Sequence, residues 1–245
     1  MNPSEKVKYI SNWIKSYVEK MPNRAQSLVI GISGGIDSSV SSTLSAMTGL
    51  KTIVLTMPIK QKENQHDLSL KHQQWLVKNF KNVEAYTLSL DKLFETFSIT
   101  LNKFDNEHGF ANSRARLRMT TLYQVAAANK GIVVGTGNKV EDFGIGFYTK
   151  YGDGGVDISP IADCNKTEVW ELGKELGILK EIIDAPPTDG LWDDGRTDEG
   201  QLGFKYSELE DAMGNPNSPH REQYEKIRNQ NLHKMEPIPV CKIPS

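Results

Sequence analysis

A glycine-rich segment combines residue types that suit phosphate chemistry. Residues 33–38 read SGGIDS and follow a short apolar run. The glycines let the backbone turn tightly and approach a ligand closely, and a helix starting here would direct amide N–H groups at an anion. Phosphates would repel the Asp37 carboxylate unless a cation lies between them, so Asp37 indicates Mg²⁺. The segment predicts a site for a phosphate compound together with a divalent cation.

The same six residues could instead form only a turn and a helix cap, because Asp and Ser are good caps. The apolar residues 28–32 before them make that interpretation the weaker one. The segment lacks the lysine and spacing of a Walker A motif, and it is not G-x-G-x-x-G. Its S-G-G-x-D-S pattern is similar to the pyrophosphate loop of the N-type ATP pyrophosphatases. That resemblance implies attack at the α-phosphate of ATP.

Short apolar runs alternate with helical patterns through the first half of the chain. Strands are expected at residues 28–32, 52–57, 83–88 and 132–135, and helices at 4–21, 37–49, 63–79, 90–101 and 113–129. This alternation predicts an α/β fold with a doubly wound, mainly parallel sheet flanked by helices, the fold class of the ATP pyrophosphatases. Ligands of such sheets bind beyond the carboxyl ends of the strands. Residues 33–38 and 136–142 are therefore expected to face one crevice.

Composition narrows the class of protein. A net charge of −2 argues against nucleic acid or anionic lipid as a partner. No stretch approaches the roughly 18 apolar residues of a membrane span, the N-terminus lacks the apolar core of a signal peptide, and two cysteines are too few for a disulfide framework. A cytoplasmic location is expected. Residues 1–245 are expected to form a single domain. The Pro-, Gly- and Asp-rich residues 185–203 predict a mobile loop at about 189–205.

A second motif narrows the family. Residues 146–157 read GFYTKYGDGGVD, which resembles the G-F-[FY]-T-K-[FY]-G-D-G-G-x-D segment of NAD synthetases. Further matches occur in the same order along the chain, at residues 115–119, 135–141, 165–166, 187–188 and 233–234. The chain therefore resembles the ammonia-dependent NAD synthetases from its first strand nearly to its C-terminus.

The resemblance implies a ligase that adenylates the nicotinate carboxylate of deamido-NAD, using ATP and Mg²⁺, and then amidates it with ammonia. NAD, AMP and pyrophosphate would be the products of this last step of NAD biosynthesis. The resemblance also implies a homodimer whose interface builds the dinucleotide site. Glutamine-dependent relatives carry an additional hydrolase domain with a catalytic cysteine. No cysteine precedes the first expected strand, so ammonia is expected as the direct nucleophile unless a separate subunit supplies it.

The resemblance also implies roles by position. The implied ATP-binding residues are Gly31, Ile32, Ser33, Gly34, Gly35, Ile36, Asp37, Ser38, Thr136, Lys166 and Thr188. The implied deamido-NAD-binding residues are Arg116, Lys150, Asp157, His233 and Lys234. The implied metal ligands are Asp37 and Glu141, and the implied catalytic residues are Asp153 and Lys166.

Three details qualify these roles. Related enzymes often show TDHAAE where residues 136–141 read TGNKVE, and one extra residue precedes Gly146. Asp142 therefore competes with Glu141 for the metal, although the spacing favours Glu141. Arg116 points roughly 200° away from its neighbour two residues earlier in the helix, so the arginines of residues 114–118 cannot all serve one site. A lysine in a helix first turn, as expected for Lys166, is unfavourable unless an anion lies nearby.

Two rival functions remain open. Another N-type ATP pyrophosphatase, such as a tRNA thiolase, would typically need catalytic cysteines in a loop or an added RNA-binding domain, which the net charge of −2 disfavours. A non-catalytic adenine-nucleotide-binding module would need neither Asp37 nor a second cationic block. The metal dependence of ATP binding distinguishes the module from an enzyme.

Overall fold

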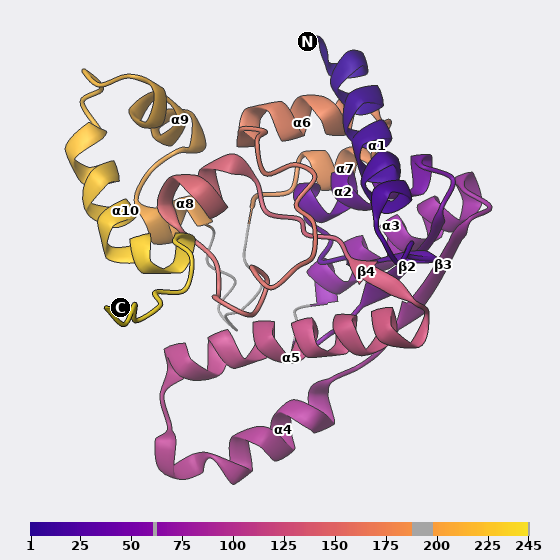
Figure 1. Ribbon diagram of the computed structural model, residues 1–245, viewed down its shortest axis with the longest axis horizontal. Coiled ribbons are helices and arrows are strands. Elements are labelled where there is room, and N and C mark those ends of the chain that lie inside the picture. The colour runs from indigo at the N-terminus through magenta and orange to yellow at the C-terminus, as the bar shows by residue number, and fades with distance from the viewer. Residues whose placement is uncertain (61–62, 188–197, 245) are drawn as a thin grey trace.

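A four-stranded parallel sheet forms the centre of the computed structural model, which describes residues 1–60, 63–187 and 198–244. The sheet has the order β3-β2-β1-β4 (Figure 1), with bounds Ser27–Gly31 for β1, Lys51–Thr56 for β2, Val83–Thr87 for β3 and Gly131–Val133 for β4. β1 pairs with both β2 and β4. The loops that follow β1 and β4 therefore leave the same edge of the sheet side by side. The predicted parallel α/β fold is confirmed.

Helices cover both faces of the sheet (Figure 1). One face is covered by α2 (Ile36–Met47) and α3 (Glu63–Asn79), with α1 (Pro3–Lys20) and α6 (Lys166–Glu175) packed against α2. The other face is covered by α5 (Glu107–Ala128), and α4 (Asp91–Thr100) packs on α5. Leu28 and Ile30 of β1 belong to the apolar cluster on the first face, and Val29 belongs to the cluster on the second. Successive side chains of a strand point to opposite faces, which explains why this run is apolar throughout.

Helix α2 is buried although it is rich in serine. Its serine hydroxyls are buried, and most of them donate to backbone carbonyls one turn earlier, as Ser45 does to the oxygen of Ser41 (2.8 Å). The Ser41 hydroxyl has no hydrogen-bond partner among the described residues. Ser42 shares a hydrogen bond with Nε2 of His72 on α3 (3.0 Å). Burial lowers the pKa of His72 to about 4, although a hydrogen bond to the backbone of Ser39 opposes the shift. His72 is therefore neutral at pH 7, and it adds no charge beside α2.

Helix α5 begins earlier than its apolar spacing predicts. The Asn106 side chain accepts a hydrogen bond from the amide of Gly109 (2.7 Å). This N-cap starts the helix at Glu107 rather than at the expected Ser113. The short 3₁₀ helix η1 (Asn102–Phe104) joins α4 to this cap.

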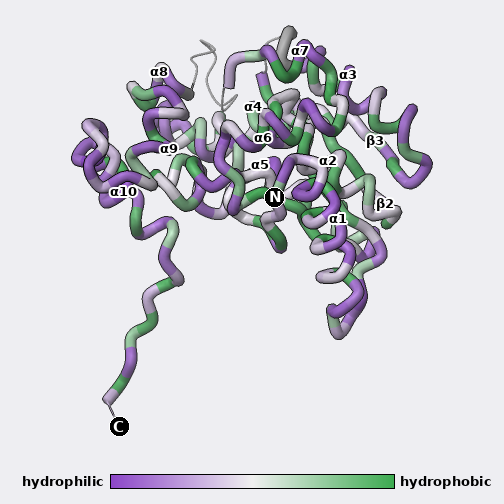
Figure 2. The backbone as a smooth tube through the Cα atoms, turned by 90° about the horizontal axis from the view of Figure 1, so that it is seen from above, coloured by the Kyte–Doolittle hydropathy of each residue, from purple (hydrophilic) through white to green (hydrophobic). Residues whose placement is uncertain are grey.

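The C-terminal part of the chain forms a lobe beside the sheet (Figures 1 and 2). It contains α8 (Asp198–Leu202), α9 (Tyr206–Gly214) and α10 (Arg221–Met235), which pack with the π-helix η2 (Lys139–Ile145) from the middle of the chain around a third apolar cluster. The four-residue helix α7 (Lys180–Ile183) follows α6, and the chain after α10 extends away from the body (Figure 2). No helix in the described residues has the length and apolar character of a membrane span.

The predicted irregular stretch at residues 185–203 is partly wrong, because residues 198–202 form α8. Gly203, with a φ of 74°, ends that helix in the left-handed region that glycine adopts without strain. The predicted mobile loop at about 189–205 overlaps α8. Its residues 189–197 lie outside the described residues, so the mobility stays a prediction, as does the single-domain assignment.

Candidate active site

The segment of residues 33–38 forms a tight turn from β1 into α2. Gly34 has a φ of 92°, a conformation that favours glycine. The backbone amide of Ser33 donates to the hydroxyl of Ser38 (3.2 Å), and that hydroxyl donates to the carbonyl of Gly35 (3.0 Å). No side chain caps the start of α2. The first amide N–H groups of α2 thus lack the side-chain acceptor that a helix start usually has.

The turn lines a cavity of about 270 Å³ at the carboxyl edge of the sheet. The loop after β4 lines the same cavity through Thr136 and Gly137, and so do Glu141, Asp153 and Lys166. Two segments that are about a hundred residues apart in the chain therefore meet, because β1 and β4 are neighbours in the sheet. The expectation that residues 33–38 and 136–142 face one crevice is confirmed.

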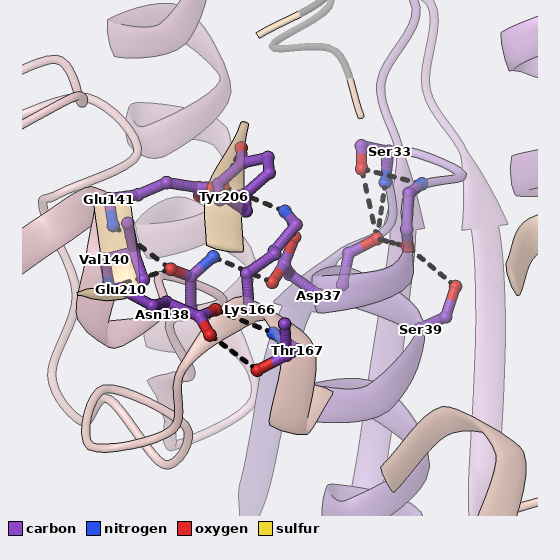
Figure 3. Close-up of polar contacts among 12 residues, drawn as sticks. Ser33, Asp37, Ser39, Asn138, Val140, Glu141, Lys166, Thr167, Tyr206 and Glu210 are labelled. Atoms are coloured by element: carbon purple, nitrogen blue, oxygen red, sulfur yellow. Dashed lines mark hydrogen bonds and ion pairs between the residues drawn. The ribbon is translucent and has the colours of Figure 1, made fainter. Parts of the chain in front are cut away.

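Lys166 joins the two segments inside this cavity (Figure 3). Its Nζ donates to Oδ2 of Asp37 (2.5 Å) and to Oε1 of Glu141 (2.8 Å). The lysine side chain is only 2% exposed. It is the first residue of α6, whose N-cap Asn165 forms a capping box with Glu168. The two carboxylates are the anions that a lysine in a helix first turn requires.

Asn138 holds the two carboxylate-bearing segments in register. Its amide nitrogen donates to Oδ1 of Asp37 (3.0 Å), and its amide oxygen accepts from the backbone N–H groups of Val140 and Glu141 (3.0 and 3.1 Å). The residue is fully buried and forms the N-cap of η2. Asn138 was not among the predicted site residues, although an Asn before a helix start is a recognisable cap signal.

The three charged side chains perturb one another strongly. Burial opposes the charge of Lys166, but Asp37 and Glu141 outweigh it and raise the pKa of the lysine. Burial also opposes the charge of Glu141, yet Lys166 and the hydrogen bonds from Tyr206 and Asn138 lower its pKa. Burial and the Glu141 charge raise the pKa of Asp37 despite Lys166. One ammonium thus neutralises only one of the two carboxylates. The net charge of the three side chains is −1 when both carboxylates are ionised.

The helix that carries Glu141 is a π-helix. Its closing residue Gly146 has a φ of 65° and donates from its amide to the carbonyl of Glu141, five residues earlier. A π turn holds one more residue than an α turn. This geometry accommodates the extra residue that precedes Gly146 relative to the motif of related enzymes.

Asp142 also lines the cavity, but it lies in a different position from Glu141. A Cβ on Gly137 would come within 1.8 Å of the Asp142 carboxylate, so the carboxylate fills the space that a side chain on residue 137 would need. Burial, followed by the charges of Glu141, Asp153 and Asp37, raises the pKa of Asp142 well above its ordinary value, whereas Lys234 opposes the shift. Glu141 rather than Asp142 faces Asp37 across Lys166, in agreement with the spacing argument.

The residues implied in deamido-NAD binding fall into two places. Arg116 donates from Nε to the carbonyl of Lys150 (3.3 Å), and Lys150 donates from Nζ to the carbonyl of His233 (3.0 Å). Lys234 donates to the carbonyl of Tyr148 (2.9 Å). The last turn of α10 therefore lies against residues 148–150 beside the N-terminal half of α5.

Asp157 lies apart from that group. Its carboxylate accepts from the backbone amide of Val133 (2.7 Å) and from the hydroxyl of Tyr123 (3.1 Å). Asp153, by contrast, lines the cavity and accepts from the amide of Thr149 (3.0 Å). Thr188 lies outside the described residues.

Arg116 separates from Arg114 and Arg118, as the helix spacing predicts, whereas Arg114 and Arg118, four residues apart, lie beside different cavities. Arg118 lines the cavity and donates from Nε to the carbonyl of Met57 (3.0 Å). Arg114 lies over the ring of Phe94 (5.0 Å) beside a different cavity. Arg116 is exposed and reaches Lys150. Of the three, Arg118 rather than Arg116 lines the cavity, which the sequence pattern alone did not indicate.

Comparison with known proteins agrees with this geometry. Residues 6–243 match the family model of NAD synthase. The chain belongs to the NAD synthase family. The NH(3)-dependent NAD(+) synthetase of Carboxydothermus hydrogenoformans is 37% identical over 216 residues, covering 86% of this chain and 85% of that protein. The family resemblance inferred from residues 33–38 and 146–157 is thereby confirmed.

Solved structures of similar proteins superpose over nearly the whole chain. An NMN synthetase from Francisella tularensis has a TM-score of 0.91 at 34% identity, covering 99% of this chain and 100% of that one. An NH3-dependent NAD synthetase from Campylobacter jejuni has a TM-score of 0.79 at 23% identity, with coverages of 99% and 100%. The second likeness shows the shared fold. Family membership makes the chain a ligase that uses ATP and acts on small molecules.

The ion-paired cluster yields a stability prediction. Lys166→Met leaves two buried carboxylates facing each other without a counter-charge, so the free energy of unfolding should fall by about 3 kcal/mol at pH 7. Lys139→Met is the matched control, because its ion pair with Asp163 (2.9 Å) is exposed and should contribute about 0.5 kcal/mol or less. Urea denaturation measures both. Equal losses for the two variants would contradict the account of the cluster.

Proposed function

We propose that the chain adenylates the nicotinate carboxylate of deamido-NAD with ATP and then amidates it with ammonia, giving NAD, AMP and pyrophosphate. The observation that carries this proposal is the position of Lys166 between Asp37 and Glu141, beside the uncapped start of α2, in a member of the NAD synthase family. The relatives' names supply the nucleophile, NH3, and the product, NAD(+).

Each part of the site has a task in this reaction. A carboxylate is a poor acceptor for ammonia, because its carbon is electron-rich and oxide does not leave. Transfer of AMP to it creates a mixed anhydride with a good leaving group. The uncapped amides of α2 and the hydroxyls of Ser33 and Ser38 would hold the departing pyrophosphate. Lys166 would place its ammonium beside the phosphate oxygens on which negative charge develops.

The carboxylates fit a magnesium site. In the described residues, no three His, Cys, Asp or Glu side chains gather as a complete metal site. Magnesium in nucleotide sites usually takes one or two carboxylates and completes its shell with phosphates and water. Asp37 and Glu141 supply two such carboxylates and carry one negative charge more than Lys166 neutralises. Asp37 and Glu141 would hold Mg²⁺, which would supply positive charge for the phosphates of ATP, and Lys166 would turn its ammonium towards the nucleotide.

The remaining roles follow the family positions. Residues 31–38 with Thr136 and Thr188 would bind ATP, and Asp153 would act beside the reacting carboxylate. Arg116, Lys150, His233 and Lys234 form one group against α5 that would bind the dinucleotide, together with Asp157. A cavity of about 270 Å³ is small for ATP and a dinucleotide together. This supports a homodimer in which the partner completes the dinucleotide site. We place the enzyme in the cytoplasm, as the sequence predicts.

A second acceptor has support from one specific observation. The Francisella tularensis NMN synthetase superposes better than the Campylobacter jejuni NAD synthetase, with TM-scores of 0.91 and 0.79, and its sequence is more similar, at 34% against 23%. An NMN synthetase would amidate the mononucleotide acid, nicotinate mononucleotide, which carries the same reacting carboxylate without the adenylyl half. The chemistry of the loop, Lys166 and the carboxylates would be unchanged. The two candidates differ only in how much of the acceptor is recognised.

Product analysis tests the reaction. The protein incubated with ATP, Mg²⁺, ammonium and deamido-NAD should form NAD, AMP and pyrophosphate in equal amounts, because the α-phosphate is attacked.

Asp37→Asn should lower the rate more than about 100-fold, since it removes a charge needed in the transition state, while circular dichroism shows the fold retained. Formation of ADP, or AMP release that does not depend on the acceptor, would refute the proposal.

Acceptor preference separates the two candidates. The ratio kcat/KM should be at least about 10-fold higher for deamido-NAD than for nicotinate mononucleotide, because contacts to the adenylyl half add binding energy in the transition state. Initial rates with each acceptor at saturating ATP, Mg²⁺ and ammonium give this ratio. A preference for the mononucleotide would replace the first candidate by the second.

A further inference from the structure

Tyr206 is a buried aromatic residue whose hydroxyl reaches the ion-paired cluster. It is the first residue of α9 and is 1% exposed. Its hydroxyl donates to Oε1 of Glu141 (2.6 Å), and its ring lies 4.8 Å from Nζ of Lys166 (Figure 3). A single side chain thus contacts both Lys166 and one of the two carboxylates that it neutralises.

Contacts with other described residues hold Tyr206 in this position. Its backbone amide donates to Oε1 of Glu199 on α8 (3.1 Å). Its ring packs edge-on against Trp170 of α6, with centroids 6.0 Å apart. It also belongs to the apolar cluster of the C-terminal lobe, together with Tyr224. These contacts fix the orientation of the Tyr206 side chain, so its hydroxyl points at Glu141.

The Tyr206 hydroxyl and the Lys166 ammonium meet the same oxygen of Glu141. If the ammonium moves towards a nucleotide, as the proposed reaction requires, Glu141 loses one of its donors. The tyrosine hydroxyl is neutral and can keep its hydrogen bond while a cation approaches the carboxylate. Residues that hydrogen-bond a metal-binding carboxylate set its orientation and tune its affinity for the ion.

We propose that Tyr206 is a positioning residue, which orients the Glu141 carboxylate for the divalent cation and so links the α8–α9 segment to the reaction. This role rests on the proposed function, because it concerns the cation used in adenylation. Through Tyr206, α9 contributes to a site whose other residues lie far from it in the sequence.

Binding of Mn²⁺, followed by its electron paramagnetic resonance signal, tests the role without turnover. The protein is mixed with Mn²⁺ and α,β-methylene-ATP, which cannot be cleaved at the bond in question. Tyr206→Phe should weaken Mn²⁺ binding at least about 10-fold, within the range found when such supporting residues are changed. The Mg²⁺ concentration for half-maximal rate should rise in parallel, while the KM for the acceptor stays within about twofold of the wild-type value.

Tyr224→Phe is the matched control. Tyr224 is buried in the same cluster, and within the described part of the chain no hydrogen bond of its hydroxyl is found. Its variant should bind Mn²⁺ as the wild type does. Incorporation of 3-fluorotyrosine at position 206 keeps the hydroxyl and should restore binding, which separates the hydrogen bond from a loss of packing.

The outcomes are distinct. If the wild type binds Mn²⁺ and Tyr206→Phe binds it within about twofold as tightly, the positioning role is refuted and the proposed function is untouched. If the wild type itself needs no divalent cation for nucleotide binding or turnover, the proposed metal chemistry is wrong and the role of Tyr206 fails with it. Equal weakening in Tyr206→Phe and Tyr224→Phe would also refute the role, because it would indicate a general effect of the lobe.

Discussion

Lys166 places a single ammonium between Asp37 and Glu141, and the rest of the site is arranged around this shared charge. The three side chains come from the starts of α2, η2 and α6, so each sits where a helix begins. Carboxylates are favoured at helix starts and a lysine is not. The lysine is therefore held by its partners rather than by its own helix. Because the buried cluster has a net charge of −1 when both carboxylates are ionised, binding of a cation there is electrostatically favourable.

The parallel sheet brings these helix starts together. β1 lies between β2 and β4, so the chain leaves β1 into α2 next to the loop that follows β4. This is the point of a doubly wound sheet at which ligands bind. Asn138 spans the junction by bonding both Asp37 and the start of η2. The C-terminal lobe contacts the same site through Tyr206 of α9, whose hydroxyl donates to Glu141.

Local signals predicted the parts of the site that local chemistry determines. The strand before residues 33–38, the capping box at Asn165 and the carboxylate at Asp37 each have a short-range pattern, and the structure brings Asp37, Glu141 and Lys166 together. The position of Tyr206 had no such signal, because its partner Glu141 lies 65 residues away. The earlier start of α5 was missed because a single cap at Asn106 outweighed the apolar spacing. The helices α8 to α10 follow from packing of the lobe, which periodicity alone does not specify.

The central claim is that this cluster serves transfer of AMP to a carboxylate, and an oxygen label tests it most directly. Adenylation followed by amidation moves one oxygen of the acceptor carboxylate into the phosphate of AMP. Turnover of deamido-NAD labelled with ¹⁸O in its nicotinate carboxylate, with unlabelled ATP and ammonium, should therefore give AMP carrying one ¹⁸O by mass spectrometry and unlabelled pyrophosphate. Label in pyrophosphate or in free phosphate, or AMP without label, would contradict the account.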